Sequence, residues 1–533
     1  GRWLVYGLQR EFDFYADRMR LAALERATGA HTVLTEGWDT SAGEWTFDPD
    51  APATLWLTGE VGPRNAVWSL DIAAAAAAAA AGPAGATPAL RAVDGTLSSP
   101  RPAGGRVFCG HAALAAPPSA AWFAPGEGAR GAAAALHRIG GFTDAAMAGV
   151  AVGPVEDVTF AGADGDAVQM FVVYPPGAAV PDPGERPARP WPLVHMIHGG
   201  PHGTFGDGWH WRWCAHAFAA PGYVVALVNF HGSTGFGEAF TKSILGGWGD
   251  RPSRDVEAAT DLLVARGVAD PARLAITGGS YGGYLVSWLC GQTDRYACAV
   301  NHAGVSDFQT QFATDITQGR QRSMGGELWD DLDGLDRFNP LRQARGFTTP
   351  MLVVHGQRDY RVPYNQGLAI YNVYRARGLP ARLVVYPDEN HWILKPHNSR
   401  HWYGEVLGWL RRWLGPAAVA AALAAGLATA GCAGANGTAA AGAGVPATAP
   451  AAAPSVAAAA TLTADERQSL ADAQAGLARG GKVSAAAVAT LGAIHGAHPA
   501  SSAVLPVLQA ALIARDDWTG LAAVLAARPA LSP

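Results

Sequence analysis

The chain has 533 residues, 49% of them hydrophobic and 16% charged, so its composition predicts a folded protein of several domains and excludes wholesale disorder. The formal net charge of -5 leaves no basic surplus, which argues against nucleic acid or an anionic membrane surface as the partner. Trp518 is the only aromatic residue beyond residue 415, where alanine dominates, so the large apolar cores are expected before that point.

Residues 1–149 are predicted to form antiparallel β structure. Short runs rich in β-branched and aromatic residues lie between turn signals at 32–39, 44–59 and 66–72, with no helical periodicity between them. A similar unit recurs at 89–110, and a repeat of about 40–50 residues is typical of β-propeller blades. Only two or three such units are present and the chain begins with Gly1, so we expect a propeller truncated at its front.

Residues 150–415 are predicted to belong to the α/β class. Near-continuous apolar runs indicate buried strands at 166–174, 193–197, 223–228, 273–277, 297–301, 351–355 and 381–386. Amphipathic stretches that indicate helices lie between or after them, including 255–267, 365–378 and 402–414. This alternation predicts a doubly wound, mostly parallel sheet with helices on both faces.

The remainder of the chain divides into an apolar linker, 416–460, and a small α-helical segment, 461–533. The linker contains Cys432 after a run of small residues, in a layout that resembles a bacterial lipoprotein signal placed internally. The 415–432 run is the only candidate for membrane association, and it is a weak one for a transmembrane segment, because alanine barely favours lipid and the run is short. A capping box, Thr463 to Glu466, predicts the first helix of the last segment.

The cysteines give no sign of a metal site or a disulfide framework. Their spacing lacks the pairs of a zinc site, and they are too few for a disulfide scaffold. We therefore expect buried small side chains and no metal or other cofactor, although Cys290 and Cys298 remain candidates for a bridge in an oxidising compartment.

A nucleophile elbow is predicted at Ser280, within Gly278-x-Ser280-x-Gly282. The motif follows an apolar strand and precedes a helix, which is the setting in which a strained turn holds the serine oxygen above a sheet. Glycines are needed there because the turn packs backbone against backbone.

A serine nucleophile needs a base, and the base needs an orienting acid, each presented where a strand ends. Asp359 follows one predicted strand and His391 follows the next, so we assign them as acid and base. Asp388 is a rival acid, but it shares the loop of His391. The other nearby histidines, which we expect not to be the base, are His355, His397 and His401.

The oxyanion of the tetrahedral intermediate needs preorganised N–H donors. We predict the backbone N–H groups of Tyr281, next after the nucleophile, and of Gly200, in the His198-Gly199-Gly200-Pro201 loop after a core strand. Trp209, in the cluster with Trp211 and Trp213, is a candidate lining residue of the substrate pocket. Glu327 is a candidate acid for a substrate ammonium group, although the solvated-loop interpretation is stronger for it.

Several motifs in order resemble the prolyl oligopeptidase family of serine peptidases, in its acylaminoacyl-peptidase and dipeptidyl-peptidase V branch. They span 198–213, 229–240, 248–249, 278–284, 355–363 and 387–396, and 15–21 resembles a late propeller segment. The resemblance implies an α/β-hydrolase domain behind a β-propeller and the same triad of Ser280, Asp359 and His391. It also implies release of dipeptides or blocked amino acids from the N-termini of short peptides, through an acyl-enzyme.

Two other functions stay open at this point. One is a carboxylesterase on the same fold, and the other is an inactive fragment or fusion that acts as a binding module. A periplasmic or secreted location is slightly favoured over a cytoplasmic one by the family resemblance, and the sequence does not predict an oligomeric state.

Overall fold

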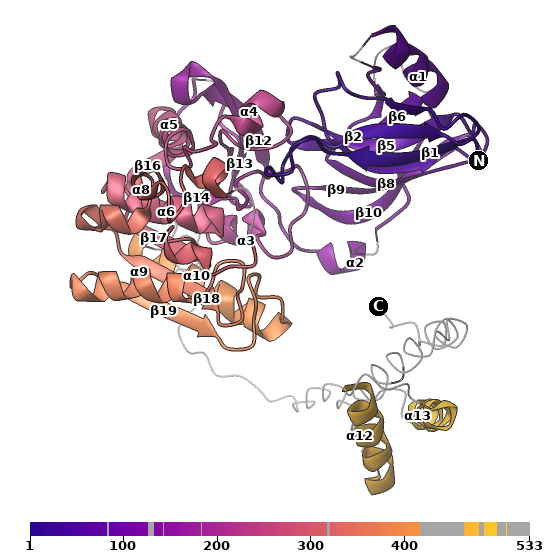
Figure 1. The fold of residues 1–533 in the computed structure, drawn as a ribbon. Coiled ribbons are helices and arrows are strands. Elements are labelled where there is room, and N and C mark those ends of the chain that lie inside the picture. Colours follow the sequence, from indigo (N-terminus) through magenta and orange to yellow (C-terminus); the bar gives the residue numbers. More distant parts are fainter. Residues whose placement is uncertain are drawn as a thin grey trace, which may run out of the picture. The chain divides into compact units, whose positions relative to one another are not determined.

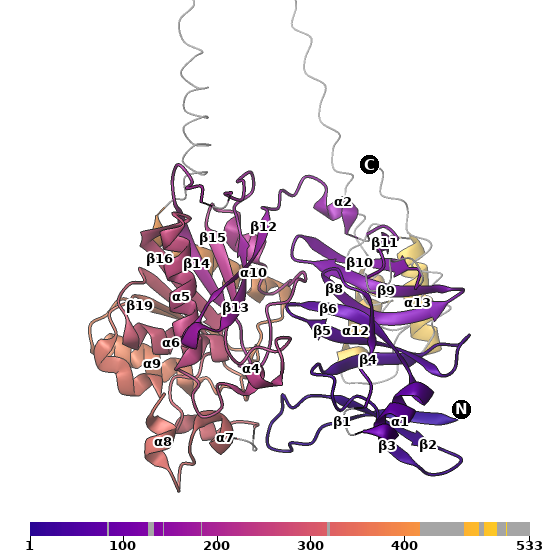
Figure 2. The same cartoon turned by 90° about the horizontal axis from the view of Figure 1, so that it is seen from above.

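The computed structural model describes residues 1–82, 85–125, 133–141, 143–182, 184–316, 320–415, 463–478, 484–497 and 508. They fall into two units, Gly1–Ala435 and Asn436–Pro533, and each is described by itself. Figures 1 and 2 show the first unit as an N-terminal β region beside a sheet flanked by helices.

The N-terminal region is antiparallel β structure, as predicted. A three-stranded sheet contains β1 (Trp3–Leu8), β2 (Arg20–Glu25) and β3 (His31–Val33). The strands that follow are β4 (Ala42–Phe47), β5 (Thr54–Val61), β6 (Arg64–Asp71), β7 (Ala89–Ala92), β8 (Thr96–Ala103), β9 (Arg106–Ala113), β10 (Ala116–Phe123) and β11 (His137–Arg138). The parallel pairing of Asn65 with Thr96 links two antiparallel groups of strands. One group contains β4 to β7, and the other contains β8 to β11. Two consecutive groups of this kind fit the expected propeller blades.

A helix, α1 (Ile72–Ala81), interrupts the β structure between β6 and β7. Asp71 caps it, since its side chain accepts a hydrogen bond from the N–H of Ala74 at 2.8 Å. Ile72 and Ala75 are buried, so this alanine-rich run packs one side against the sheet. A short helix, α2 (Asp144–Met147), lies near the end of this region.

An eight-stranded sheet forms the second half of the unit, in the order β12-β13-β15-β14-β16-β17-β18-β19. The pairs β12/β13 and β13/β15 are antiparallel and the other neighbours are parallel, which confirms the predicted mostly parallel sheet. Its strands are β12 (Val155–Ala161), β13 (Ala167–Val173), β14 (Trp191–Ile197), β15 (Val224–Asn229), β16 (Ala269–Gly279), β17 (Cys298–His302), β18 (Met351–Gly356) and β19 (Ala381–Tyr386).

Helices cover both faces of this sheet. One face packs against α5 (Arg251–Ala265), α6 (Tyr281–Gln292) and α9 (Asn365–Ala376), and the other against α3 (Ala215–Ala219) and α10 (Pro396–Leu414). Along β14, Leu193 and Ile197 belong to the first core whereas Val194 and Met196 belong to the second, because successive side chains point to opposite faces. The shorter helices are α4 (Glu238–Lys242), α7 (Arg320–Met324) and α8 (Leu332–Asp336).

Cys290 and Cys298 are buried free thiols, one in α6 and one in β17, and no bridge joins them. Cys109 and Cys214 are also free. Burial raises the pKa of the Cys290 thiol to about 12, so this thiol stays protonated and packs as a small apolar side chain.

The second unit contains α12 (Ala464–Ala478) and α13 (Ala485–Ala497). The predicted capping box is formed: the Thr463 N–H donates to Glu466 Oε2 at 2.7 Å, and the Glu466 N–H donates to Thr463 Oγ1 at 3.3 Å. Among the described helices, none is both long enough and apolar enough to cross a bilayer. The lipoprotein-like segment, Cys432 and most of the 415–432 run lie outside the described residues.

Candidate active site

Ser280 lies on the sharp turn between β16 and α6, with φ 59° and ψ -121°. A positive φ is strained for a residue with a side chain, and two hydrogen bonds hold the turn. The Ser280 N–H donates to the His302 carbonyl at 2.9 Å, and the Tyr284 N–H donates to the Ser280 carbonyl at 3.0 Å. This is the geometry of a nucleophile elbow at the C-terminal edge of a parallel sheet.

Close backbone packing explains the glycines around Ser280. A Cβ on Gly278 would lie 2.4 Å from the backbone of Gly282, and a Cβ on Gly282 would lie 2.1 Å from the carbonyl oxygen of Ile197. On the facing loop, a Cβ on Gly199 would lie 3.2 Å from the Ser280 Cβ. The elbow therefore has room for glycine alone at its two flanks.

Asp359 and His391 come together from the loops after β18 and β19. His391 Nδ1 lies 2.6 Å from Asp359 Oδ2, while the other carboxylate oxygen of Asp359 accepts the N–H groups of Arg361 at 2.9 Å and Val362 at 2.8 Å. Burial opposes ionisation of Asp359, but interactions with His355 and His391 outweigh it and hold the pKa of the Asp359 carboxyl below its usual value. Asp359 therefore stays ionised while it contacts the His391 ring.

The rival residues have other contacts. Asp388 forms an ion pair with Lys395 and accepts a hydrogen bond from Asn398 at 3.1 Å. His355 is buried, and its Nε2 lies 2.7 Å from the Val362 carbonyl and 3.4 Å from Asp359 Oδ2. His401 Nδ1 lies 2.9 Å from the Tyr386 hydroxyl. His397 is exposed at the start of α10.

His302, at the end of β17, contacts both Ser280 and His391, which the sequence did not reveal. The Trp402 indole N–H donates to His302 Nδ1 at 2.9 Å, so the ring proton is on Nε2, which makes a long contact of 3.4 Å with the His391 carbonyl. Its own carbonyl accepts the Ser280 N–H. Burial, followed by the charges of His391 and His355, lowers the pKa of His302 to about 3. His302 therefore stays neutral while it contacts the Ser280 turn and the loop that carries His391.

The loop predicted to form the oxyanion hole lies beside Ser280. Gly199, Gly200 and Tyr281 all line the same cavity as Ser280 and His391. His198 anchors this loop, because its ring stacks on Phe230 at 4.1 Å and its Nε2 lies 2.9 Å from the Ser233 hydroxyl. Donation from the Gly200 and Tyr281 N–H groups to an oxyanion stays a prediction.

The two candidate substrate contacts are not brought to this cavity. Among the described residues that line it, neither Trp209 nor Glu327 is found. Trp209 instead packs against Trp211, with ring centroids 5.5 Å apart, and the Glu327 carbonyl accepts backbone N–H groups in its own turn. Trp213, from the same loop as Trp209, does line the cavity. The tryptophan side chains of this loop therefore point in different directions.

The cavity has a volume of about 1000 Å³, and part of its wall comes from the N-terminal region. The loop 9–19, between β1 and β2, contributes Phe12, Asp13 and Tyr15. Tyr15 also meets the oxyanion-hole loop, since its hydroxyl accepts the His202 N–H at 3.3 Å. The site is therefore built from both halves of the unit.

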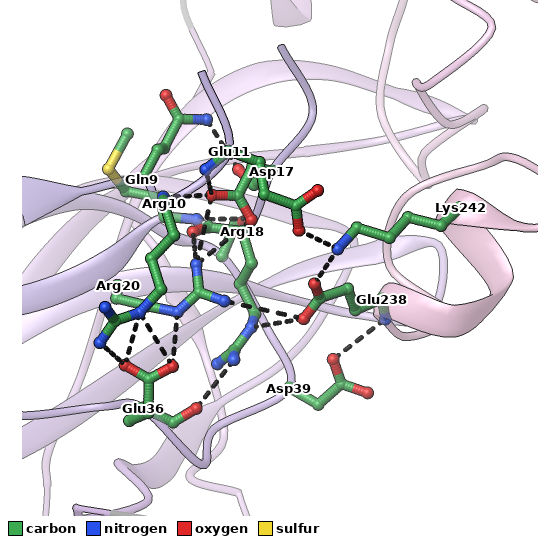
Figure 3. A network of polar contacts seen from close by, with 12 residues as sticks. Gln9, Arg10, Glu11, Asp17, Arg18, Arg20, Glu36, Asp39, Glu238 and Lys242 are labelled. Carbon is green, nitrogen blue, oxygen red and sulfur yellow. Dashed lines mark hydrogen bonds and ion pairs between the residues drawn. The ribbon is translucent and has the colours of Figure 1, made fainter. Parts of the chain in front are cut away.

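A network of charged groups holds loop 9–19 against the α/β half (Figure 3). Lys242, at the end of α4, forms ion pairs with Glu11 and Glu238. Arg322 pairs with Glu11 and, at 3.0 Å, with Asp13, while Arg18 pairs with Glu238 at 3.3 Å. Removing one member would leave partly buried charges uncompensated, so the network restrains the loop at the cavity.

Carboxylates in this network come close enough together to suggest a cation site. One oxygen each of Glu11, Asp17 and Glu238 lie within 4.8 Å of one another. Lys242 and Arg20 already compensate these charges, with Arg20 Nη1 3.2 Å from Asp17 Oδ1. The cluster therefore fits an internal ion-pair network better than a metal.

Part of the chain is similar to known proteins. Residues 209–417 match the model of the prolyl oligopeptidase family. The chain is 36% identical over 253 residues to dipeptidyl-peptidase 5 of Aspergillus fumigatus, a match that covers 46% of this chain and 34% of that protein. It is 34% identical over 259 residues to dipeptidyl-peptidase 5 of Schizosaccharomyces pombe, covering 48% of this chain and 37% of the relative. The matches thus span about a third of the length of these curated relatives.

A solved structure with a similar fold is the acylaminoacyl peptidase of Pyrococcus horikoshii. The TM-score is 0.65 at 18% identity, and the superposition covers 78% of this chain and 62% of the other. At this identity the likeness concerns the fold, which includes the N-terminal β region as well as the α/β half.

Proposed function

We propose, on the premise that this chain carries a domain of the prolyl oligopeptidase family, that it is a serine peptidase that acts near the N-termini of short peptides and releases dipeptides or blocked amino acids. The observation that carries the proposal is the 2.6 Å contact between Asp359 and His391 in the loops beside the Ser280 elbow. Both Ser280 and His391 line one cavity.

In the proposed reaction, His391 removes the proton from the Ser280 hydroxyl as its oxygen attacks the substrate carbonyl. Asp359 faces Nδ1, which leaves Nε2 of His391 for this proton. The N–H groups of Tyr281 and Gly200 would stabilise the oxyanion. His391 then protonates the leaving amine, and water, activated in the same way, hydrolyses the acyl-enzyme.

The shape and lining of the cavity support a short peptide as the substrate. Its volume of about 1000 Å³ is bounded on one side by loop 9–19. Trp248, Val305 and Val362 line it together with Tyr281 and belong to one apolar core, so an apolar side chain next to the attacked carbonyl would be favoured there.

The test is the variant Ser280→Ala, assayed with dipeptidyl and acyl-aminoacyl p-nitroanilides. We expect turnover to fall to background and labelling by a fluorophosphonate probe to disappear, because no other nucleophile occupies the elbow. Ser399→Ala, on the surface near the start of α10, is the matched control and should keep both signals.

Three outcomes would contradict the proposal. Retained turnover in Ser280→Ala would remove the nucleophile assignment. Cleavage of short acyl esters without cleavage of peptide amides would favour a carboxylesterase. Failure of the unaltered protein to label at Ser280 would favour an inactive binding module.

A further inference from the structure

Arg212 lines the cavity and has no anionic partner among the described residues. Its guanidinium lies over the ring of Trp392, 5.5 Å from the ring centroid, and no carboxylate in the described part of the chain lies within 4.0 Å of it. A partly buried cation normally has a carboxylate partner, because leaving water is costly for a charge. An anionic group of a ligand could therefore supply the negative charge that the Arg212 guanidinium lacks.

The groups around Arg212 are neutral. Burial, followed by the charge of Arg212, lowers the pKa of His210, and the pKa of His302 is lowered to about 3. Burial raises the pKa of the Tyr403 hydroxyl to about 12, and this hydroxyl donates to the Arg212 carbonyl at 3.0 Å. These neutral groups surround Arg212 without balancing the positive charge of its guanidinium.

The rest of the cavity does not supply the missing anion. Asp13 is paired with Arg322 at 3.0 Å, and Asp315 is paired with Arg361 at 2.7 Å. Arg358 lines the cavity as a further cation with no ion-pair partner among the described residues. The lining therefore carries an excess of positive charge that favours an anionic substrate group.

The place of Arg212 indicates which part of the substrate would carry this group. Trp392 directly follows His391, and their ring centroids are 6.4 Å apart. His391 is the group that would protonate the leaving amine, so a side chain beside it faces the fragment that leaves first. Arg212 on Trp392 is therefore on the leaving-group side of the scissile bond.

We propose that Arg212, laid over Trp392, binds a carboxylate of the leaving fragment. This inference rests on the proposed function. The carboxylate is either the C-terminus of a very short peptide or the side chain of an aspartate or glutamate after the scissile bond. Arginine suits both, because its planar fork donates two parallel N–H bonds to the two carboxylate oxygens.

The experiment compares three tripeptides that differ only beyond the scissile bond: Ala-Phe-Ala, Ala-Phe-Ala-amide and Ala-Phe-Asp-amide. Release of Ala-Phe is measured by mass spectrometry. For the unaltered protein we expect kcat/KM to be about tenfold higher for a carboxylate-bearing peptide than for Ala-Phe-Ala-amide, mainly through KM. Preference for the first peptide identifies the main-chain carboxylate, and preference for the third identifies the side chain.

The variants test which arginine is responsible. In Arg212→Gln the ratio of kcat/KM between acid and amide substrates should fall to about one, and in Arg212→Lys it should be intermediate, since lysine keeps the charge but loses the fork. Arg358→Gln, the other unpaired arginine of the lining, is the matched comparison and should keep the ratio. Partial misfolding lowers kcat/KM for the acid and the amide substrate by the same factor, so the ratio of the two values within one variant is unaffected by it.

Two results would overturn the inference: a ratio near one in the unaltered protein, or a ratio in Arg212→Gln that stays as high as in the unaltered protein. If no tripeptide is cleaved, the release of dipeptides is ruled out as the activity, and the inference is tested separately by protection. The fluorophosphonate should then label Ser280 more slowly with Ala-Phe-Ala or Ala-Phe-Asp-amide present than with Ala-Phe-Ala-amide, and equal protection by all three contradicts it.

Discussion

At the scale of single residues, the contact between Asp359 and His391 determines which nitrogen of the base is free. Because Asp359 Oδ2 lies 2.6 Å from Nδ1, the other ring nitrogen, Nε2, is the one left free of this contact. The carboxylate is itself held by two backbone N–H groups, so its orientation does not depend on the histidine.

Replacing this carboxylate by an amide should change both catalysis and the pH dependence of stability. We expect Asp359→Asn to lower kcat by about 10⁴-fold at pH 7, because the amide favours the wrong ring tautomer. The pKa of Asp359 is depressed in the folded protein, so its ionised form stabilises the fold above the unfolded pKa near 4, and this stabilisation is lost as pH falls through the lower folded pKa. The difference in unfolding midpoint between the two proteins should accordingly shrink below about pH 4.

The measurements are p-nitroanilide turnover at pH 7 and urea unfolding across the acid range. Asp388→Asn is the control, since Asp388 pairs with Lys395 on the surface, and it should keep kcat within about twofold. A drop in kcat in that variant as large as in Asp359→Asn would contradict the assignment of the acid.

The turn at Ser280 and the meeting of Asp359 with His391 could be predicted from sequence because they depend on local rules, glycine spacing and loops that follow strands, while the triad itself stays a prediction. His302 and Arg212 escaped prediction for a different reason. Their contacts are with neighbours far along the chain, Trp402 for His302 and Trp392 for Arg212, and no short pattern marks such contacts. Trp209 and Glu327 failed as cavity residues because sequence does not give the direction of a side chain in an irregular loop.

At the scale of elements, loop 9–19 depends on a helix of the other half for its position. Glu11 on the loop and Glu238 on α4 are both paired with Lys242, so one ammonium joins the two elements. Each pair is partly buried, which makes the loss of the shared cation more costly than the loss of an exposed pair.

We expect Lys242→Met to raise KM for dipeptidyl p-nitroanilides about three- to tenfold, because the ammonium that joins Glu11 to Glu238 would be lost and, among the described residues, Arg322 alone would then hold Glu11. The value of kcat should change less than about twofold, since Ser280 and His391 lie on the other half. Steady-state kinetics separates the two constants, with Lys395→Met as the control for loss of a lysine at an exposed ion pair. A fall in kcat at constant KM would show that Lys242 acts on the triad rather than on the loop.

Sequence patterns predicted the parallel strands well, because buried strands are nearly continuous in apolar residues. The edge strand β12 (Val155–Ala161) was missed, since it alternates polar and apolar residues and is buried mainly at Phe160. Helix α10 was predicted to begin at residue 402, but it begins at Pro396, in a polar first turn without apolar periodicity.

At the scale of the whole molecule, the described residues that line the cavity belong to the first unit, Gly1–Ala435. A chain that ends at Ala435 should therefore keep kcat/KM for p-nitroanilide substrates within about twofold of the full chain, as expected when distant changes leave a site intact. Side-by-side kinetics and thermal unfolding of the two proteins measure this. A tenfold loss of kcat/KM without a change in unfolding temperature would assign the last unit a part in the reaction.

Loop 9–19 forms one wall of the cavity and the Ser280 elbow another, so inhibitors of different lengths can measure the distance between these two walls. A compound with a serine-reactive group at one end and a group matched to Asp13 and Tyr15 at the other would touch both halves of the first unit at once. The linker length that gives the tightest binding would then report the separation of the two halves in solution.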